Sequence, residues 1–389
     1  MVRRYSFRYR SQHPEMYPEV CGICKPQRRF SAPSHKAQHD EMKYRPIQQQ
    51  RFYDHSMHLT HSGVFYPSSS SSVTTITASD LNTFVMKEIE PDTEYNKSCK
   101  EVVDQLCQFM QHDFPNELRP SEIIKGGSLG KGTAVKWKSD VDLVVFLVRF
   151  DSILELHQAI KDILDGMISS LNSKKDLTVE RTNAHAVKVS LSCHAGHTHK
   201  VDILPRVNVL GTSVNLLRTE TKRKIYTTMG AQSPSLREYY SAALAPLQIS
   251  FVSDVPTKVK TLIRLVKYWR KTCFEESTRR KRLPSSYLLE LITIGEWEDA
   301  GGSVNFDLMK GFLHVLLAIA DYKRLKHAWN TNYDPKQYTR SYSCYVMDPA
   351  NPFNNVMEPC DCWDLVESKA RQFLHMSEFN GLSISSGWI

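Results

Sequence analysis

Two aspartates, Asp140 and Asp142, lie at the start of the apolar run Val141–Val148 and limit what this chain can fold into. Residues two apart in a β-strand point to the same side. Both carboxylates would therefore face one side of a strand, while Leu143 and its odd-numbered neighbours face the other. Two adjacent like charges need compensation. Divalent cations provide it, because carboxylate oxygens suit Mg²⁺ and a pair of ions stabilises the attacking and leaving oxygens of a displacement at phosphorus.

A glycine-rich turn, Gly126-Gly127-Ser128, precedes this strand, with eleven residues between Ser128 and the first aspartate. Glycine allows a backbone to approach phosphate groups closely, and the serine offers a hydroxyl and an amide to phosphate oxygens. The Walker A loop, Gly-x-x-x-x-Gly-Lys-Ser/Thr, is an alternative phosphate-binding motif. The sequence does not match it, because Lys125 takes the place of the first glycine and Gly132 that of the Ser/Thr.

The spacing of this turn and strand resembles the signature of the nucleotidyltransferase superfamily. Within that superfamily, several segments are similar to the 2′-5′ oligoadenylate synthetases, in the order 125–133, 139–147, 263–269, 283–291, 348–356 and 384–389. The resemblance covers about residues 80–389. It implies an α+β, bilobal nucleotidyltransferase fold, in which the N-lobe has a mixed or antiparallel sheet with flanking helices and the C-lobe is helical.

The resemblance also implies a set of metal ligands. Asp202 lies between Val201 and Ile203 in a segment that we expect to form a strand beside that of Asp142. In the family, an aspartate at this place is the third carboxylate. Asp140, Asp142 and Asp202 are therefore predicted to be the catalytic residues and to hold two Mg²⁺ ions, with Asp202 positioning or deprotonating a ribose 2′-hydroxyl.

The donor nucleotide is assigned by the same resemblance. Gly127 and Ser128 would contact its β- and γ-phosphates, and Lys267 corresponds to the family's lysine that holds the triphosphate. Tyr287 matches the tyrosine beside the donor base, but Ser286 replaces the glutamine that precedes it in the family. Base recognition is therefore the part of the site for which the sequence departs from the family pattern.

Helical and strand spacing locate the surrounding elements. Asp80 and Asp92 are each expected to cap a helix, the first carrying Leu81 to Ile89 and the second reaching Met110. A further helix is predicted over about 154–171. Two strands rich in β-branched residues follow, over 186–192 and 200–204, and a helix with a buried apolar stripe begins at Pro256.

The N-terminal segment differs from the rest in composition. Residues 1–85 carry eleven Lys and Arg against six Asp and Glu, which accounts for +5 of the chain's net charge of +8. Because this segment is rich in His, Tyr, Gln and Ser and lacks periodicity, we predict a disordered basic tail over 1–79. The N-lobe is predicted over 80–212 and the C-lobe over 213–389.

Two groups of cysteine and histidine have the residue types of a zinc site. Within 17–44, the pattern Cys21, Cys24, His35 and His39 resembles a degenerate Cys2His2 finger, but the ten residues between Cys24 and His35 are fewer than usual. A chance pair in a disordered tail is the interpretation we favour. The second group, Cys193, His194, His197 and His199, is compatible with a transition metal or with a polar hairpin tip, and again we favour the latter.

The predicted location is the cytoplasm. No apolar stretch approaches the ~18–20 residues of a membrane span, and the N-terminus lacks the apolar core of a signal peptide. Nine cysteines without regular spacing indicate reduced thiols rather than a disulfide framework.

The resemblance predicts an enzyme that uses ATP as both donor and acceptor, releases pyrophosphate and makes 2′-5′-linked oligoadenylates without a template, in innate antiviral signalling. Two alternatives keep the fold: a weakly active or inactive RNA-binding sensor, and a cyclic-dinucleotide synthase. Vertebrate synthetases are activated by double-stranded RNA, partly through basic residues before a Pro-Thr-Lys stretch. Here 241–255 contains no Lys or Arg, so RNA dependence stays open. The Cys-Phe-Lys oligomerisation motif of some relatives is missing near His375, and we expect a monomer.

Overall fold

The computed structural model describes two short strands and then residues 78–136, 141–194, 196–211, 219–274, 281–376 and 388. The predicted tail zinc pattern and Asp140 lie outside the described residues. The two short strands, β1 (Ser56–Leu59) and β2 (Phe65–Ser68), pair antiparallel within a segment for which we predicted no regular structure.

A five-stranded mixed sheet has the strand order β3-β4-β7-β6-β5. Its members are β3 (Pro120–Lys125), β4 (Val141–Leu147), β5 (Leu177–Thr182), β6 (Val187–Ser192) and β7 (Thr198–Arg206). β4 and β7 run parallel, whereas the other neighbouring strands run antiparallel. The mixed sheet, with helices around it, confirms the predicted α+β fold class.

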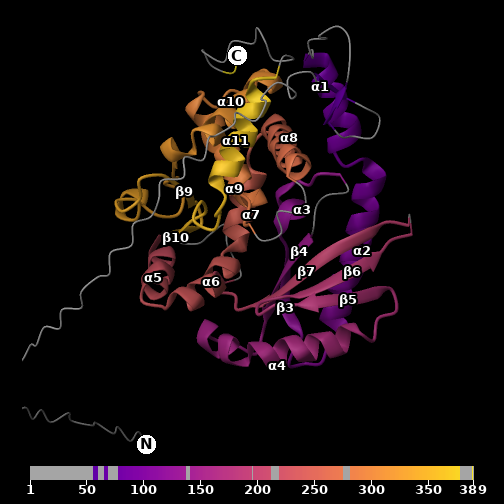
Figure 1. Ribbon diagram of the computed structural model, residues 1–389. Helices are drawn as coiled ribbons and strands as arrows, with labels where there is room; N and C mark the ends of the chain where they lie inside the picture. The colour runs from indigo at the N-terminus through magenta and orange to yellow at the C-terminus, as the bar shows by residue number, and fades with distance from the viewer. Residues whose placement is uncertain are drawn as a thin grey trace, which may run out of the picture. The chain divides into compact units, whose positions relative to one another are not determined.

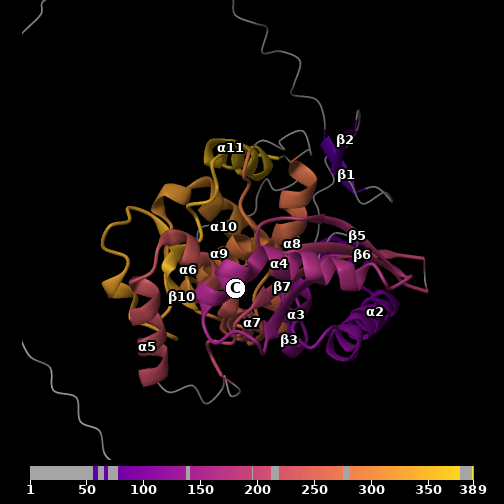
Figure 2. The same ribbon diagram turned by 90° about the horizontal axis from the view of Figure 1, so that it is seen from below.

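Alternation along the strands separates the two faces of this sheet. Odd-numbered apolar residues of β4, β6 and β7 are buried in one cluster with α2 (Thr93–His112) and α4 (Ile153–Leu171). On the opposite face, Val144 and Phe146 pack against Ala245 at the start of α7 (Ala245–Ser253). Figure 1 shows α4 running beneath the sheet, and Figure 2 shows the same helix from below. The polar positions of β4 and β7 therefore lie on the α7 face.

Helices make up most of the other described residues. The helices are α5 (Thr219–Gly230), α6 (Pro234–Ala243), α8 (Thr257–Cys273), α9 (Ser286–Asp299), α10 (Leu308–Ala320) and α11 (Trp363–Leu374). A second hydrophobic cluster holds α8, α9 and α10 together, and Trp388 packs into it with its ring 5.2 Å from that of Phe306. α9, α10 and α11 lie on the opposite side of the described structure from α4 (Figure 1).

Some local expectations are confirmed and others are wrong. Asp92 caps α2, because its carboxylate accepts a hydrogen bond from the Tyr95 amide at 2.7 Å. Asp80 does not cap its helix. α1 (Ala78–Phe84) begins two residues earlier, and a π-helix, η1 (Val85–Ile89), continues it.

The pattern did not predict strands β3 and β5. Both are edge strands, and an exposed edge weakens the apolar alternation on which such predictions rest. The helical C-terminal part also contains a small sheet of order β10-β9-β8, formed by β8 (Lys326–His327), β9 (Tyr345–Asp348) and β10 (Asn351–Asn355).

Two expectations about the chain as a whole can be compared with the described residues. All seven cysteines in this part of the chain are free thiols, as predicted. Each described helix is too short or too polar to cross a membrane.

Candidate active site

Asp142 and Asp202 lie side by side on adjacent parallel strands. Asp142 of β4 is the register partner of Asp202 of β7, so the two carboxylates project from the same face of the sheet. Both are partly exposed, whereas Leu143 and Ile203, one position further on, are fully buried on the other face. The structure therefore brings together two of the three predicted metal ligands. The third, Asp140, stays a prediction.

The glycine turn packs directly against Asp142. The amide of Gly126 donates to the Asp142 carbonyl at 2.6 Å. Gly127 has a φ of +58°, and a Cβ added there would lie 3.0 Å from Cγ of Asp142 and closer still to its Oδ2. Glycine is thus required at position 127 by the backbone conformation and by the neighbouring carboxylate. Ser128 follows in α3 (Gly127–Lys131), and its carbonyl accepts from the Thr133 amide at 2.9 Å.

Asp202 has a cationic neighbour that the sequence motifs did not predict. Lys188 of β6 is the register partner of Asp202, and its ammonium forms an ion pair with Oδ2 of that aspartate. Each side chain is 22% exposed. The sequence does indicate the side on which Lys188 lies, because the alternation of apolar and polar residues in Val187–Leu191 places this lysine on the polar face of the strand. What the sequence could not provide was the register that aligns this lysine with Asp202.

Lys267 lies at the centre of a buried ion-pair network. It is 1% exposed, and its ammonium donates to Oε1 of Glu290 at 2.9 Å and to the Thr133 carbonyl at 2.9 Å. One turn earlier on α8, Arg264 donates to the Gly132 carbonyl at 2.7 Å. Two cations of α8 thus hold the segment that follows α3. The predicted role of Lys267 in triphosphate binding stays a prediction, and the structure adds that its ammonium is directed at Glu290.

Glu290 joins two lysines and a hydroxyl. Besides Lys267, it accepts from Lys131 of α3 at 3.0 Å and from the Thr133 hydroxyl at 2.6 Å. Burial opposes ionisation of this carboxyl, but Lys131 and Lys267 outweigh burial and lower the pKa of Glu290 to about 2. Two ammonium groups around one carboxylate leave a net positive charge inside the protein, next to the glycine turn. Glu290 was not predicted from the sequence, because its position in an apolar helix gave no sign of its partners.

Tyr287 extends the same network towards β9. Lys131 places its ammonium 3.8 Å from the centroid of the Tyr287 ring, and the Tyr287 hydroxyl donates to Oδ1 of Asp348 at 3.0 Å. Asp348 is fully buried and also accepts from the side chains of Gln248 and Asn354 at 2.7 and 3.1 Å. Burial raises the pKa of Asp348, and these donors oppose that effect. The Tyr287 ring is therefore fixed from both ends.

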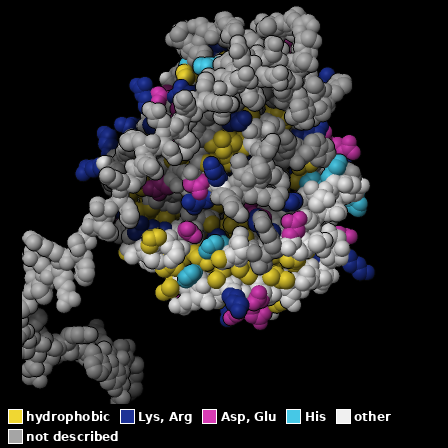
Figure 3. Space-filling view, in the orientation of Figure 1, with side chains coloured by type: hydrophobic (Ala, Val, Ile, Leu, Met, Phe, Trp, Pro, Cys, Tyr) yellow, Lys and Arg dark blue, Asp and Glu magenta, His cyan; other side chains and the backbone are white. Residues whose placement is uncertain are grey.

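One face of the described structure is of mixed charge. On the face shown in Figure 3, described Lys and Arg side chains are interspersed with Asp and Glu side chains.

The candidate site consists of three parts: the paired aspartates, the glycine turn that packs against one of them, and a buried ion-pair network with excess positive charge. Helix α3 connects this network to the sheet.

A mixed sheet that carries in-register aspartates behind a glycine turn defines a nucleotidyltransferase. A family model for the nucleotidyltransferase domain matches residues 103–192. A second model, described as the C-terminal domain 2 of 2′-5′-oligoadenylate synthetase 1, matches residues 219–388. The chain belongs to the 2′-5′-oligoadenylate synthase family and is a nucleotidyltransferase, as the sequence motifs predicted.

Relatives of known name support this membership. The chain is 32% identical to 2′-5′-oligoadenylate synthase 1A of Rattus norvegicus over 337 residues, covering 79% of this chain and 93% of the relative. It is 30% identical to synthase 3 of Mus musculus, of which it spans 27%. It is also 32% identical to the inactive synthase 1B of Rattus norvegicus over 307 residues, covering 72% of this chain and 80% of that protein. Overall similarity therefore does not by itself distinguish an active member from an inactive one.

A solved structure agrees on the fold. The CdnC protein of E. coli MS115-1, in a structure with ATP, superposes with a TM-score of 0.52 at 18% sequence identity, covering 78% of this chain and 91% of that one. Because the identity is low, this likeness supports the predicted fold class and nothing more specific.

Proposed function

We propose that this chain polymerises ATP, as donor and acceptor, into 2′-5′-linked oligoadenylates and releases pyrophosphate. The observation that carries the proposal is the in-register pair of Asp142 and Asp202 behind the glycine turn. Two carboxylates that project from the same face of neighbouring strands are the oxygen ligands that divalent cations prefer, which supports an active rather than an inactive member. The linkage, a role in innate antiviral signalling and a cytoplasmic location are carried over from the family.

The residues present fit a divalent cation. Carboxylate oxygens are the preferred ligands of Mg²⁺, and a Cβ at position 127 would fill the space beside Oδ2 of Asp142. Asp140, Asp142 and Asp202 would hold two Mg²⁺ ions. When bound, these ions would lower the pKa of the attacking hydroxyl and neutralise charge on the leaving pyrophosphate. Lys188 competes with them for Asp202, because its ammonium already neutralises that carboxylate.

The protein's own groups would bind and orient the nucleotides. Asp202 orients the ribose 2′-hydroxyl, and Gly127 and Ser128 contact the β- and γ-phosphates through the turn. The excess positive charge shared by Lys131 and Lys267 attracts the polyphosphate. Tyr287, held by Asp348, offers its ring to the base. N-lobe 80–212 and C-lobe 213–389 would then contribute one wall each, and the chain would act as a monomer.

A product assay tests the proposal. The purified full chain is incubated with ATP and Mg²⁺, with and without duplex RNA, and the products are resolved after digestion with a 3′-5′-specific nuclease. We expect a ladder of resistant oligomers that disappears in Asp142→Asn. The matched control is Asp165→Asn, which removes an exposed carboxylate from α4 and should leave the ladder unchanged.

A second function, a catalytically inactive RNA-binding protein, has support in the similarity to the inactive rat relative. Absence of turnover in every condition, combined with measurable binding of duplex RNA, would favour it over the polymerase. A single cyclic product that forms only when GTP is added to the same incubation would instead favour a cyclic-dinucleotide synthase. The three outcomes are mutually exclusive, so one experiment distinguishes the proposed activity from both alternatives.

A further inference from the structure

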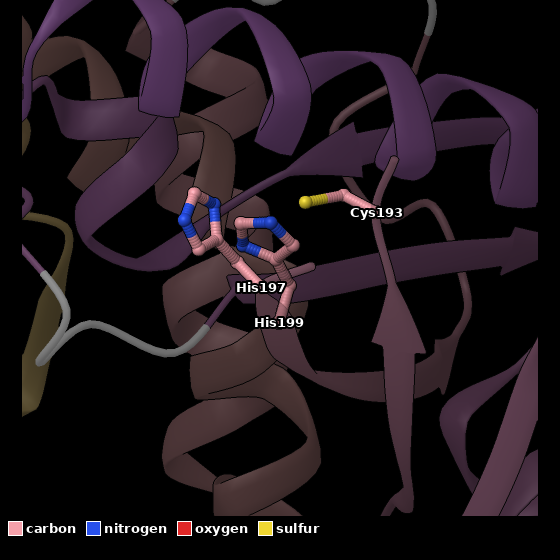
Figure 4. A group of neighbouring side chains, drawn as sticks. All are labelled: Cys193, His197 and His199. Atoms are coloured by element: carbon pink, nitrogen blue, oxygen red, sulfur yellow. The ribbon is translucent and has the colours of Figure 1, made fainter. Parts of the chain in front are cut away.

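Three side chains that can ligate a metal ion converge at the tip of the β6–β7 hairpin: Cys193, His197 and His199. Their ligand atoms all lie within 4.8 Å of one another. Figure 4 shows the sulfur of Cys193 directed towards the two imidazole rings. His194, which shares the loop, is exposed and does not belong to the cluster.

The hairpin register explains this convergence. His199 pairs with Leu191 in the hairpin register. The amide of Cys193 donates to the His197 carbonyl at 2.9 Å, so Cys193 and His197 face each other across the end of the hairpin. Odd-numbered residues of β6 and β7 project towards α2, whereas Asp202 projects from the opposite face. The cluster is thus separate from the paired aspartates of the active site, although both lie on β7.

The cluster is buried beneath α2. His199 is 3% exposed and Cys193 7% exposed, and the Tyr95 ring of α2 lies 5.3 Å from that of His199. Among the described residues, Nε2 of His199 has no hydrogen-bond partner. Buried polar atoms in native proteins almost always have a partner, because leaving one unpaired is destabilising, so this atom calls for an explanation.

We propose that Cys193, His197 and His199 bind a zinc ion. Thiolate and imidazole ligands suit Zn²⁺, whereas Mg²⁺ prefers oxygen, so the two classes of metal would occupy different sites in this protein. Tetrahedral zinc with one Zn–S of about 2.3 Å, two Zn–N of about 2.0–2.1 Å and water in the fourth position places the three protein ligand atoms roughly 3.3–3.6 Å apart. Atoms already within 4.8 Å need to move by about 1 Å to reach that geometry.

The ion would have a structural role. It would join the end of β6 to the start of β7, and these two strands carry Lys188 and Asp202 on their other face. Zinc would therefore stabilise the hairpin that positions one catalytic carboxylate without contacting the substrate. This inference does not depend on the proposed polymerase activity, because a zinc site on this hairpin would serve an inactive member equally well.

Zinc content and a cobalt spectrum test the proposal. The full chain carries Cys21→Ser and Cys24→Ser, so that the N-terminal pattern cannot contribute, and is incubated with Zn²⁺ or Co²⁺ in millimolar Mg²⁺ before unbound metal is removed. The test variants are Cys193→Ser and His199→Ala. His194→Ala is the matched control, because it removes an exposed imidazole from the same loop.

We expect about one zinc per chain in the parent and in the control, and a loss of roughly ten-fold or more in affinity in each test variant. The cobalt form should show a thiolate charge-transfer band that Cys193→Ser abolishes while its far-UV circular dichroism is retained. A parent that binds no zinc above background would overturn the proposal. So would a control that loses as much zinc as the test variants.

Discussion

Replacement of Glu290 by Gln tests whether the buried network stabilises the protein. Glu290 is 1% exposed and is the carboxylate that Lys131 and Lys267 share. Glutamine keeps the shape of the side chain but removes its charge, so two buried ammonium groups would face each other without a counterion. Removing one partner of a buried ion pair is strongly destabilising, at about 3–5 kcal/mol.

The pKa of Glu290 gives a second measure of the same effect. It falls from 4.5 to about 2 in the folded protein. A difference of about 2.5 at roughly 1.4 kcal/mol per pKa unit corresponds to about 3 kcal/mol. Because the folded-state pKa is the lower one, this stabilisation is fully present above pH 4.5 and is lost as the pH falls from 4.5 to about 2. The Gln variant should therefore lose about 3 kcal/mol at neutral pH.

Urea denaturation of the full chain between pH 3 and pH 7 measures both effects. The wild type should lose stability below pH 4.5 more steeply than Glu290→Gln, whose curve lacks this contribution. Glu101→Gln is the control, because Glu101 forms a surface pair with Lys97 at 4.0 Å and should have no measurable effect. A loss below about 1 kcal/mol at pH 7, with an unchanged slope in acid, would show that Glu290 does not stabilise the folded protein through its two lysines.

Three further substitutions test the site. Gly127→Ala should reduce turnover at least ten-fold in the product assay. The added Cβ would collide with the carboxylate of Asp142, and the backbone φ of +58° is unfavourable for alanine. A variant with the wild-type rate would contradict this prediction. Tyr287→Phe should lower the free energy of unfolding by about 1–2 kcal/mol and raise the KM for ATP, since a buried carboxylate loses a donor. An unchanged KM would show that the hydrogen bond to Asp348 does not position the ring for the base. Lys188→Met should lower the Mg²⁺ concentration for half-maximal activity several-fold, because it removes a cation that competes for Asp202. If the variant instead needs a higher Mg²⁺ concentration for half-maximal activity, Lys188 assists catalysis.

The sequence predicted the fold class and the central pair of the site because both depend on local patterns. Strand alternation places Asp142 and Asp202 on polar faces, and the glycine turn precedes Asp142 at the sequence spacing typical of the superfamily. Family resemblance added that the two strands are neighbours, and the parallel register of β4 and β7 confirms it. The edge strands and the small C-terminal sheet were missed, since exposed or short strands carry little periodicity.

The positions of the acidic residues, the glycine turn and the periodic apolar residues follow from the sequence, and they indicate the class of chemistry. Tertiary structure alone decided the partners: Lys188 for Asp202, Glu290 for Lys267, and His199 for Cys193. Period gives the face of an element to which a side chain belongs, but not what lies opposite that face. The residues that face each other across two elements depend on strand register and on packing between elements distant in the chain. Only the folded structure fixes that register and packing.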